Sequence, residues 1–279
     1  MTLAAEMRTR LAVYAVLGML PALTGCGSGG VLLPYQPAPN NLYTTLRSVE
    51  VHPQYGNPVA QLAVAVSMQA NAVRVDYTQE YGESYYDALF TAAAASKLSV
   101  LEITPYLHTN GTFAQQLPYT PAAYAAYMAA EALLRCGTVP TLMFELYNEP
   151  DTPNSQATLT TATYIALVEA TAPAIRKACP SSIILTGGTS GLDLTWDAAT
   201  SVLVPYVDGF GLHPYGLADD QMRSAITGVQ QAFGSQKPVY MTEFGPDIAA
   251  FQNTSGASPF WNTYADNLIG FSFTYAGSF

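Results

Sequence analysis

Eight short runs of apolar and β-branched residues recur along the chain, separated by stretches with helical periodicity. The runs are VEVHP near residue 49, AVRVDY near 72, SVLEITP near 99, TLMFELYN near 141, SIILTGG near 182, GFGLHPY near 209, PVYMTEFG near 238 and IGFSFTY near 269. The segments between them, such as AAYAAYMAAEALLRC, are rich in strong helix formers. Strands that alternate with helices in this way predict a parallel sheet.

The number of repeats predicts the closed form of that sheet, a (β/α)8 TIM barrel of the α/β class. An open doubly wound sheet more often has five or six strands and a glycine-rich first turn. Neither a GxGxxG sequence nor a P-loop occurs. Since the sequence stops a few residues after the eighth run, we expect the barrel to lack its final outer helix.

Composition and charge limit the ligands that such a domain can bind. The chain has 279 residues, 49% of them hydrophobic, so it can bury a large core in one domain. Its net charge of -10 includes only ten basic residues, which leaves no basic patch for a nucleic acid backbone. We therefore expect a monomer that binds a neutral or weakly charged ligand.

The first residues are predicted to lie outside the folded domain. Arg8 and Arg10 precede the apolar run LAVYAVLGMLPA, which is typical of a secretion signal over residues 1–25. The sequence LTGC ending at Cys26 resembles the bacterial lipobox, in which the cysteine carries a lipid. The alternative is an ordinary signal peptide with a chance cysteine.

The lipobox resemblance implies export across the inner membrane and a lipid anchor at the cell envelope, with no other membrane contact. Residues 26–41, rich in Gly, Pro and Asn, are predicted to form a flexible tether, and residues 42–279 the catalytic barrel. In an oxidising compartment Cys136 and Cys179, each at the end of a helical pattern, can form a disulfide; two free buried thiols are the alternative.

Polar side chains follow the predicted strands at their carboxyl ends, which all open on one face of a barrel. These segments are Arg74-Val75-Asp76 after the second strand, Asn148-Glu149-Pro150 after the fourth, His213-Pro214-Tyr215 after the sixth and Thr242-Glu243-Phe244-Gly245 after the seventh. Two glutamates are therefore expected to meet an arginine, an amide, an imidazole and a phenol.

This set of groups suits the cleavage of a glycosidic bond with retention of configuration. One carboxyl must protonate the leaving oxygen, and one ionised carboxylate must attack the anomeric carbon from about 5 to 5.5 Å away. Glu149 and Glu243 lie 94 residues apart, which agrees with strands four and seven.

The four segments resemble those of glycoside hydrolase clan A, and especially its cellulase-like members of families 5 and 39. That resemblance implies that Glu149 is the general acid/base, Glu243 the nucleophile and Asn148 the partner of the sugar 2-hydroxyl. It also implies that Arg74 and Tyr215 steady the nucleophile and that His213 lines the sugar subsite. Independently, a nearby guanidinium favours ionised Glu243, whereas Glu149 has no assigned cation and is the better candidate to hold a proton.

Two features depart from the cellulase-like pattern. Such members usually carry a His at the end of strand three, where this chain has ITPYLHTNG with His108 several residues later. They also carry a Trp after strand eight, where this chain has FSFTYAG. Tyr275 is a candidate for the missing aromatic platform.

Other polar residues have simpler explanations. Asp76 either lies at the rim near the sugar or caps the helix that follows, and capping or loop structure is favoured. Glu102 and Glu145 are expected to be interior or interface carboxylates that need partners, and not catalysts. At about 3.3 Å per residue, Glu145 lies some 13 Å deeper than Glu149 and cannot reach the same glycosidic bond. His52 either lines the site or is a structural histidine.

Aromatic residues of the predicted loops leave two roles open. Trp196, after strand five, and Trp261, after strand seven, are each either a sugar platform or local packing.

Other catalytic classes find little support in the sequence. The three histidines are scattered without metal-ligand spacing, so no metal or other cofactor is expected, and no GxSxG elbow suggests an esterase. The leading hypothesis is a retaining glycoside hydrolase acting on a β-linked polysaccharide or oligosaccharide, as an endo-β-glucanase does. The alternatives are a surface lipoprotein that binds carbohydrate without cleaving it, and a transglycosylase using the same carboxylates.

Overall fold

The structure is a computed structural model that describes residues 46–52, 56–68, 70–77, 82–104, 120–152, 159–214, 219–244 and 270–274. The chain divides into the units Met1–Gln36 and Pro37–Phe279, and all described residues belong to the second. The predicted signal, the lipidation residue Cys26, the tether, Tyr215, Tyr275 and any segment after the last strand lie outside the described residues. No helix among the described residues is long and apolar enough to cross a membrane.

All eight predicted strands are present. They are β1 (Leu46–Val51), β2 (Ala72–Asp76), β3 (Ser99–Ile103), β4 (Leu142–Leu146), β5 (Ile183–Thr186), β7 (Phe210–His213), β8 (Val239–Phe244) and β9 (Gly270–Thr274). A short additional strand, β6 (Thr189–Ser190), pairs with the end of β7. It extends the fifth strand of the barrel after the break at Gly187 and Gly188.

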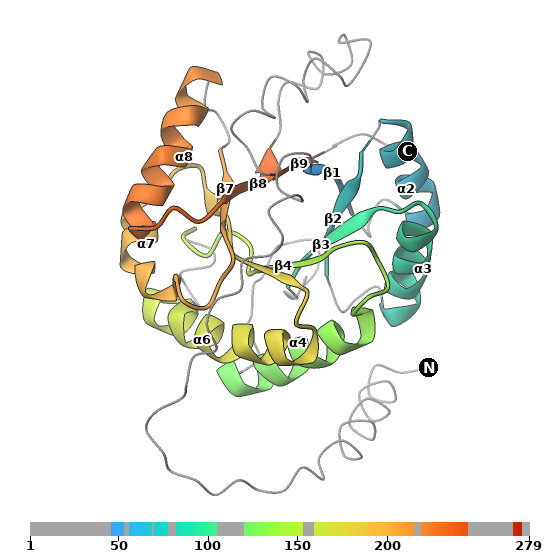
Figure 1. Cartoon of the computed structure of the whole chain (residues 1–279), viewed down its shortest axis with the longest axis horizontal. Helices are drawn as coiled ribbons and strands as arrows, with labels where there is room; N and C mark the ends of the chain where they lie inside the picture. Colours follow the sequence, from blue (N-terminus) through green and yellow to red (C-terminus); the bar gives the residue numbers. More distant parts are fainter. Residues whose placement is uncertain are drawn as a thin grey trace, which may run out of the picture. The chain divides into compact units, whose positions relative to one another are not determined.

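The strands form one parallel sheet in the order β5-β4-β3-β2-β1-β9-β8-β7-β6. A parallel bridge between Leu185 and Gly209 joins β5 to the start of β7 and closes the sheet on itself. The bond from Thr186 N to Gly209 O, 3.2 Å long, continues that seam. The fold is therefore a (β/α)8 barrel, with the strands in a central ring and the helices outside it (Figure 1).

The outer layer consists of helices that follow the strands along the chain. They are α2 (Pro58–Ser67), α3 (Gly82–Ala95), α4 (Pro121–Arg135), α6 (Thr161–Ala178), α7 (Leu194–Ala199), the 3-10 helix η3 (Ser201–Leu203) and α8 (Asp219–Phe233). Side-chain caps begin several of them: Asn57 accepts from Val59 N in α2, and Thr120 accepts from Ala123 N in α4. Proline at the first turn of both helices suits these starts, because its missing N–H would have no partner there.

Strand alternation divides the core into two layers. Outward-facing side chains such as Val73, Val100 and Phe144 belong to a large apolar cluster between sheet and helices. Inside the barrel, Leu101, Met143, Ile183, Leu185 and Tyr240 form a smaller cluster. The interior positions nearer the carboxyl ends of the strands are polar, so the apolar cluster forms a floor beneath them.

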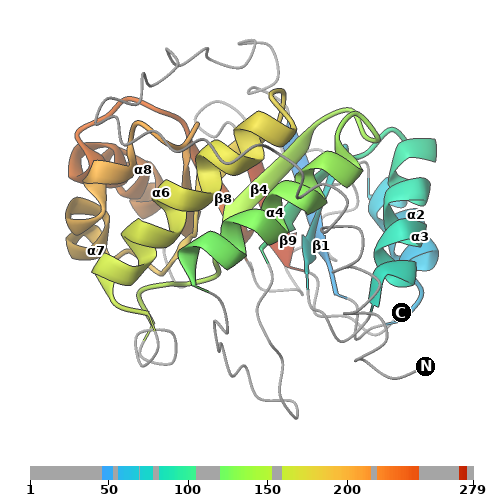
Figure 2. The same ribbon diagram turned by 90° about the horizontal axis from the view of Figure 1, so that it is seen from below.

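A disulfide joins the ends of two neighbouring outer helices. Cys136 follows α4 and Cys179 follows α6, and their sulfur atoms are bonded at 2.17 Å. Figure 2 shows the two helices side by side. The pairing predicted from the sequence is thus present, at the end of the barrel where β4 and β5 begin.

One buried carboxyl on the outer side of the barrel has no hydrogen-bond partner. Glu102 of β3 is fully buried, and neither of its side-chain oxygens is bonded within the described structure. Burial, followed by the nearby charge of Glu131, raises its pKa well above the ordinary value, although Arg135 opposes the shift. Glu102 is therefore a neutral acid in the folded protein, and the residues that the structure describes do not supply the hydrogen-bond partner expected from the sequence.

Replacing Glu102 by Leu should stabilise the protein increasingly as pH rises. The unfolded chain ionises this carboxyl above pH 4.5 while the folded chain keeps it protonated, so wild-type stability falls above that pH. Removing an unpaired buried polar group should raise the free energy of unfolding by roughly 1–3 kcal/mol. Thermal unfolding at pH 4, 6 and 8 should show a rise of roughly 2–4 °C for each kcal/mol gained.

The control for this change is Glu169→Leu, on the exposed face of α6. This variant should leave the unfolding temperature nearly unchanged at each pH. If the unfolding temperatures of Glu102→Leu and wild type changed equally with pH, Glu102 would not be held neutral in the folded protein.

Candidate active site

Polar side chains from five strands meet inside the barrel at the carboxyl ends of the strands. They are Glu50 of β1, Arg74 of β2, Glu145, Asn148 and Glu149 at the end of β4, His213 of β7 and Thr242 and Glu243 of β8. The sequence predicted five members of this group. Their contacts define the candidate active site.

Arg74 lies at the centre of these contacts and is completely buried. Its Nε donates to Glu145 Oε2 at 3.0 Å, and its Nη2 donates to Asn148 Oδ1 at 3.0 Å. Its Nη1 donates to Glu50 and lies 3.2 Å from Glu243 Oε2. The guanidinium thus reaches three carboxylates and one amide from three other strands, β1, β4 and β8.

Glu149 and Glu243 approach the same nitrogen atom. His213 Nδ1 lies 3.2 Å from Glu149 Oε1 and 3.6 Å from Glu243 Oε2. These two oxygens are therefore at most about 7 Å apart, which admits the short separation of retaining enzymes and excludes most of the inverting range. Both side chains keep contact with solvent, with 24% of Glu149 and 18% of Glu243 exposed.

His213 is a buried cation held between carboxylates. Burial lowers its pKa, but the charge of Glu243 and the hydrogen bonds with Glu145 and Glu149 outweigh this effect and raise the pKa to about 10. The charged ring donates from Nδ1 to Glu149, and its Nε2 lies 3.2 Å from Glu145 Oε1 and 3.1 Å from Thr242 Oγ1. The imidazolium therefore supports both Glu149 and the layer beneath it.

Glu145 is an interior carboxylate with a complete set of donors. Besides Arg74 and His213, it accepts from Gly188 N at 2.8 Å and from Thr242 Oγ1 at 2.8 Å. Burial raises its pKa, but Arg74 and His213 outweigh burial and lower the pKa to about 2. The expectation of a partnered interior carboxylate is confirmed.

The environment of Glu149 differs from the one expected. The sequence assigned it no cation, whereas His213 contacts it directly. Burial raises the pKa of Glu149, but the hydrogen bond and charge of His213 outweigh burial and bring the pKa below its ordinary value. The ionised form of Glu149 is thus favoured by His213, and the expectation that no cation lies beside Glu149 is wrong.

Unusual backbone geometry presents Asn148 and Glu149 at the end of β4. Tyr147 and Glu149 have φ angles of 83° and 44°, in the left-handed region that non-glycine residues seldom adopt. Tyr147 N donates to Thr104 Oγ1 at 2.8 Å, and Glu149 N donates to Gly188 O at 3.1 Å. Bonds to both neighbouring strands therefore hold a turn that would be strained in isolation.

A register irregularity has a similar effect in β8. The pairing of β8 with β9 shifts between Met241 and Phe244. Regular alternation would send Thr242 and Glu243 to opposite faces, yet Thr242 contacts Glu145 and Glu243 contacts Arg74. The shift allows consecutive side chains to join the same site.

The structure gives surroundings for two further residues with more than one expected role. Asp76, for which a cap or loop role was favoured, accepts from His52 Nδ1 at 2.8 Å inside the barrel. Trp196 is only 7% exposed and packs against Tyr164 with ring centroids 5.8 Å apart, which supports local packing over a sugar platform. His108 and Trp261 lie outside the described residues.

Glu50, Thr242 and Gly188 complete the site, although the sequence did not identify them as members. The position of Glu50 could have been predicted from the alternation of side chains along β1. Glu50 is the register partner of Arg74, so both side chains point to the same side of the sheet. Gly188 has a steric role: a Cβ there would lie 2.4 Å from His213 Nε2 and 3.0 Å from Glu145 Oε1. Only glycine leaves room for the histidine ring.

Comparison with known proteins identifies the family. A model of the cellulase family, glycosyl hydrolase family 5, matches residues 44–276. The chain belongs to glycosyl hydrolase family 5. Thr242, Glu243 and the other site residues described above all lie within the matched range. No protein of curated function matches this family 5 hydrolase in sequence.

Solved structures share the barrel of the family 5 hydrolase at low sequence identity. An endo-1,4-β-mannanase from Rhizomucor miehei is 13% identical with a TM-score of 0.61, covering 82% of this chain and 85% of its own. Thermotoga maritima Cel5A, solved with cellobiose, is 12% identical with a TM-score of 0.60, covering 85% and 92%. A family 39 β-xylosidase from Caulobacter crescentus is 16% identical with a TM-score of 0.61, covering 88% and 65%.

Gly188→Ala should disable the site of the family 5 hydrolase by moving His213. Because the added methyl group would overlap the ring, the contacts of His213 with Glu145 and Glu149 must lengthen. We expect kcat/KM to fall at least about 100-fold, as small displacements in catalytic sites do. Steady-state hydrolysis of an aryl β-glycoside, with thermal unfolding to verify the fold, measures the effect.

Gly228→Ala, on α8, is the matched control. Its added methyl group would meet only the flexible side chain of Leu194, at 3.3 Å. Wild-type kcat/KM in Gly188→Ala would contradict the assigned steric role.

Proposed function

We propose that this protein is a retaining glycoside hydrolase that cleaves β-linked polysaccharides or oligosaccharides by double displacement, with Glu149 as general acid/base and Glu243 as nucleophile. The observation that carries the proposal is the approach of both carboxylates to His213 Nδ1, at 3.2 and 3.6 Å. Two carboxylates at this separation can act on one glycosidic bond, which supports the proposal.

The contacts of Glu243 suit it to the nucleophilic role. Arg74 Nη1 lies 3.2 Å from its Oε2, so a charged donor orients the carboxylate. In the first step a Glu243 oxygen bonds to the anomeric carbon as the bond to the leaving oxygen breaks. The leaving oxygen takes its proton from Glu149.

Glu149 then acts as a base in the second step. It removes a proton from water, whose oxygen displaces Glu243 from the anomeric carbon and restores the original configuration. For the first step Glu149 must be protonated, whereas the contact with His213 lowers its pKa and favours the ionised form. A bound sugar would exclude water from Glu149 and oppose ionisation, so we expect protonation to accompany substrate binding.

Asn148 is the proposed partner of the sugar 2-hydroxyl. Its Oδ1 accepts from Arg74 Nη2 at 3.0 Å, which fixes the amide orientation and turns the NH2 group away from the guanidinium. A hydrogen bond from that amide to the 2-hydroxyl strengthens in the transition state of such reactions.

For the substrate we propose a β-1,4-linked glucan, cleaved in endo fashion. The family model describes a cellulase, and the structural neighbours include endoglucanases and endo-mannanases. Initial rates and product sizes on β-glucan, mannan and xylan test this choice. Preferential release of short oligomers from mannan or xylan would reassign the sugar, whereas oligosaccharides longer than the substrate would indicate transglycosylation.

We further propose that the protein acts outside the inner membrane on a lipid anchor at Cys26. The apolar amino-terminal run and the LTGC sequence support this location. The disulfide between Cys136 and Cys179 fits an oxidising compartment. Metabolic labelling with a fatty acid, lost in Cys26→Ala, tests the anchor.

Glu243→Ala should lower kcat at least about 10³-fold on an activated aryl β-glycoside, because the attacking carboxylate is removed. Azide should restore turnover of this variant and give an α-glycosyl azide, identifiable by NMR. Glu149→Ala should instead lose about 10²–10⁴-fold on substrates with poor leaving groups, and azide should give the β-azide.

Glu102→Gln is the control for both catalytic variants, because it changes a buried carboxyl on the outer side of β3. It should keep wild-type kcat. Full activity in Glu243→Ala would refute the assigned mechanism, and carbohydrate binding without turnover by wild type would favour a binding protein.

A further inference from the structure

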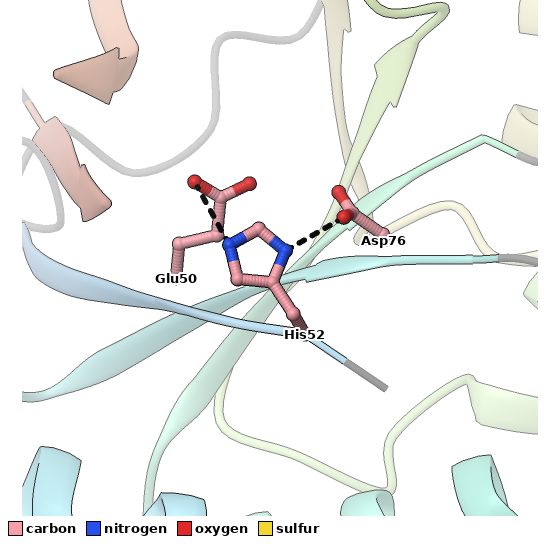
Figure 3. A group of neighbouring side chains, drawn as sticks. All are labelled: Glu50, His52 and Asp76. Atoms are coloured by element: carbon pink, nitrogen blue, oxygen red, sulfur yellow. Dashed lines mark hydrogen bonds and ion pairs between the residues drawn. The ribbon is translucent and has the colours of Figure 1, made fainter. Parts of the chain in front are cut away.

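Glu50, His52 and Asp76 form a second group of titratable side chains beside the proposed catalytic pair (Figure 3). His52 Nδ1 lies 2.8 Å from Asp76 Oδ2, and its Nε2 lies 3.9 Å from Glu50 Oε2. Residues 50, 52 and 76 come from two adjacent strands, so sequence spacing gave no sign of this group. The mechanism above does not use them.

The backbone of His52 is fixed by α2. Gln61 is buried and accepts from His52 N at 3.0 Å while donating to His52 O at 2.9 Å. With its ring bound to Asp76 as well, His52 has a defined position, and 14% of its side chain is exposed. The three side chains therefore have fixed positions in the barrel interior.

Glu50 connects this group to the proposed nucleophile. It is the register partner of Arg74 on the neighbouring strand, and it accepts from Arg74 Nη1. The same nitrogen lies 3.2 Å from Glu243 Oε2. Glu50 and Glu243 therefore share one donor. A negative charge on either residue weakens the electrostatic attraction between Arg74 and the other.

Charge balance shows that the described interior holds more carboxyl groups than cations. The carboxyl groups are Glu50, Asp76, Glu145, Glu149 and Glu243, and the cations are Arg74, His52 and His213. When Glu149 holds the proton that an acid catalyst needs, one negative charge remains in excess. Because an uncompensated buried charge is costly, a second proton is expected on one of the other carboxyl groups.

Glu50 is the best acceptor for that second proton. Glu145 receives four donors, Asp76 has the close imidazolium of His52, and Glu243 is partly exposed. Glu50 is 2% exposed, shares Arg74 and lies 3.9 Å from His52. Burial raises its pKa to about 7, with Glu243 and Asp76 also raising it and Arg74 and His52 opposing them.

We propose that Glu50 works as a neutral acid and, acting through Arg74 as a positioning residue, assigns the proton of the catalytic pair to Glu149. This inference rests on the proposed roles of Glu149 and Glu243. With Glu50 neutral, Arg74 Nη1 is directed at Glu243, and the proton stays on Glu149. With Glu50 ionised, Glu50 competes with Glu243 for that nitrogen, and the nucleophile loses the donor that positions it.

The spacing of the second group would also admit a metal ion, since its three ligand atoms lie within 4.8 Å of one another. The surrounding charges favour a proton instead. Glu50 is already bound to the guanidinium of Arg74, and Asp76 is bound to His52, so a cation would have to compete with two resident positive charges.

The test is the pH dependence of kcat, which reports ionisations in the enzyme–substrate complex. In wild type, kcat on a saturating aryl β-glycoside should fall on the alkaline side as Glu50 loses its proton. Glu50→Gln, a neutral isostere, should move the midpoint of that fall upward by about one pH unit or more. Glu102→Gln makes the same chemical change on the outer side of β3 and should leave the midpoint in place.

The direction of the midpoint shift in Glu50→Gln distinguishes the two groups whose ionisation could cause the alkaline fall, Glu50 and Glu149. If Glu50 is already ionised and Glu149 alone titrates, removing the negative charge of Glu50 lowers the pKa of Glu149 and moves the midpoint down. An unchanged or lowered midpoint in Glu50→Gln would overturn the inference. If that variant does not fold, Glu50→Ala provides the same test, because it also removes the Glu50 carboxyl: the midpoint should rise if Glu50 titrates and fall if Glu149 alone does.

The azide experiment keeps this inference distinct from the proposed function. Full activity of Glu243→Ala would reject the catalytic assignment itself. Azide rescue of that variant, together with an unshifted midpoint in Glu50→Gln, would leave the catalytic pair intact and reject only the role of Glu50.

Discussion

The candidate site depends on one fully buried guanidinium. Placing the charge of Arg74 inside the barrel is costly unless carboxylates surround it, and such carboxylates must come from other strands that point into the barrel. Glu50, Glu145 and Glu243 meet this requirement from β1, β4 and β8, and Asn148 accepts the remaining branch. The interaction that makes the interior polar region stable is therefore also the one that positions the proposed nucleophile.

His213 has the complementary role on the opposite side of the network. As a cation it balances Glu145 beneath it and holds Glu149 at the surface of the site. Its contacts require the absence of a side chain at Gly188, so a backbone position on the fifth strand controls an imidazole on the sixth. The position of His213, and with it that of Glu149, thus depends on packing as well as on charge.

The sequence predicted the barrel and the main site residues because both follow from simple periodicities. Alternating strand and helix patterns identified all eight strands, and parallel strands bring residues such as Arg74 and Glu243 to one face. Features of three-dimensional contact were missed. The cation beside Glu149 comes from another strand, the shift in β8 lies between Met241 and Phe244, and Glu50 reads in sequence as one more residue of a strand.

For some residues the sequence allowed two roles, and only their contacts in the folded structure distinguish between these roles. Trp196 is compatible with either a ring platform or a loop anchor until Tyr164 is seen against it. Asp76 likewise needed His52, which lies 24 residues away in the chain. Such ambiguities are resolved by neighbours that no local pattern encodes.

The disulfide between Cys136 and Cys179 gives the two ends of the barrel different tolerance to evolutionary change. It closes a 43-residue segment at the end where strands begin and, by the chain-entropy account, contributes about 4 kcal/mol. Loops at the opposite end can then diverge, lengthen or shorten while the covalent link and the layer beneath them maintain the scaffold. New sugar preferences could arise there by changes in loop sequence alone, without renewed selection for folding.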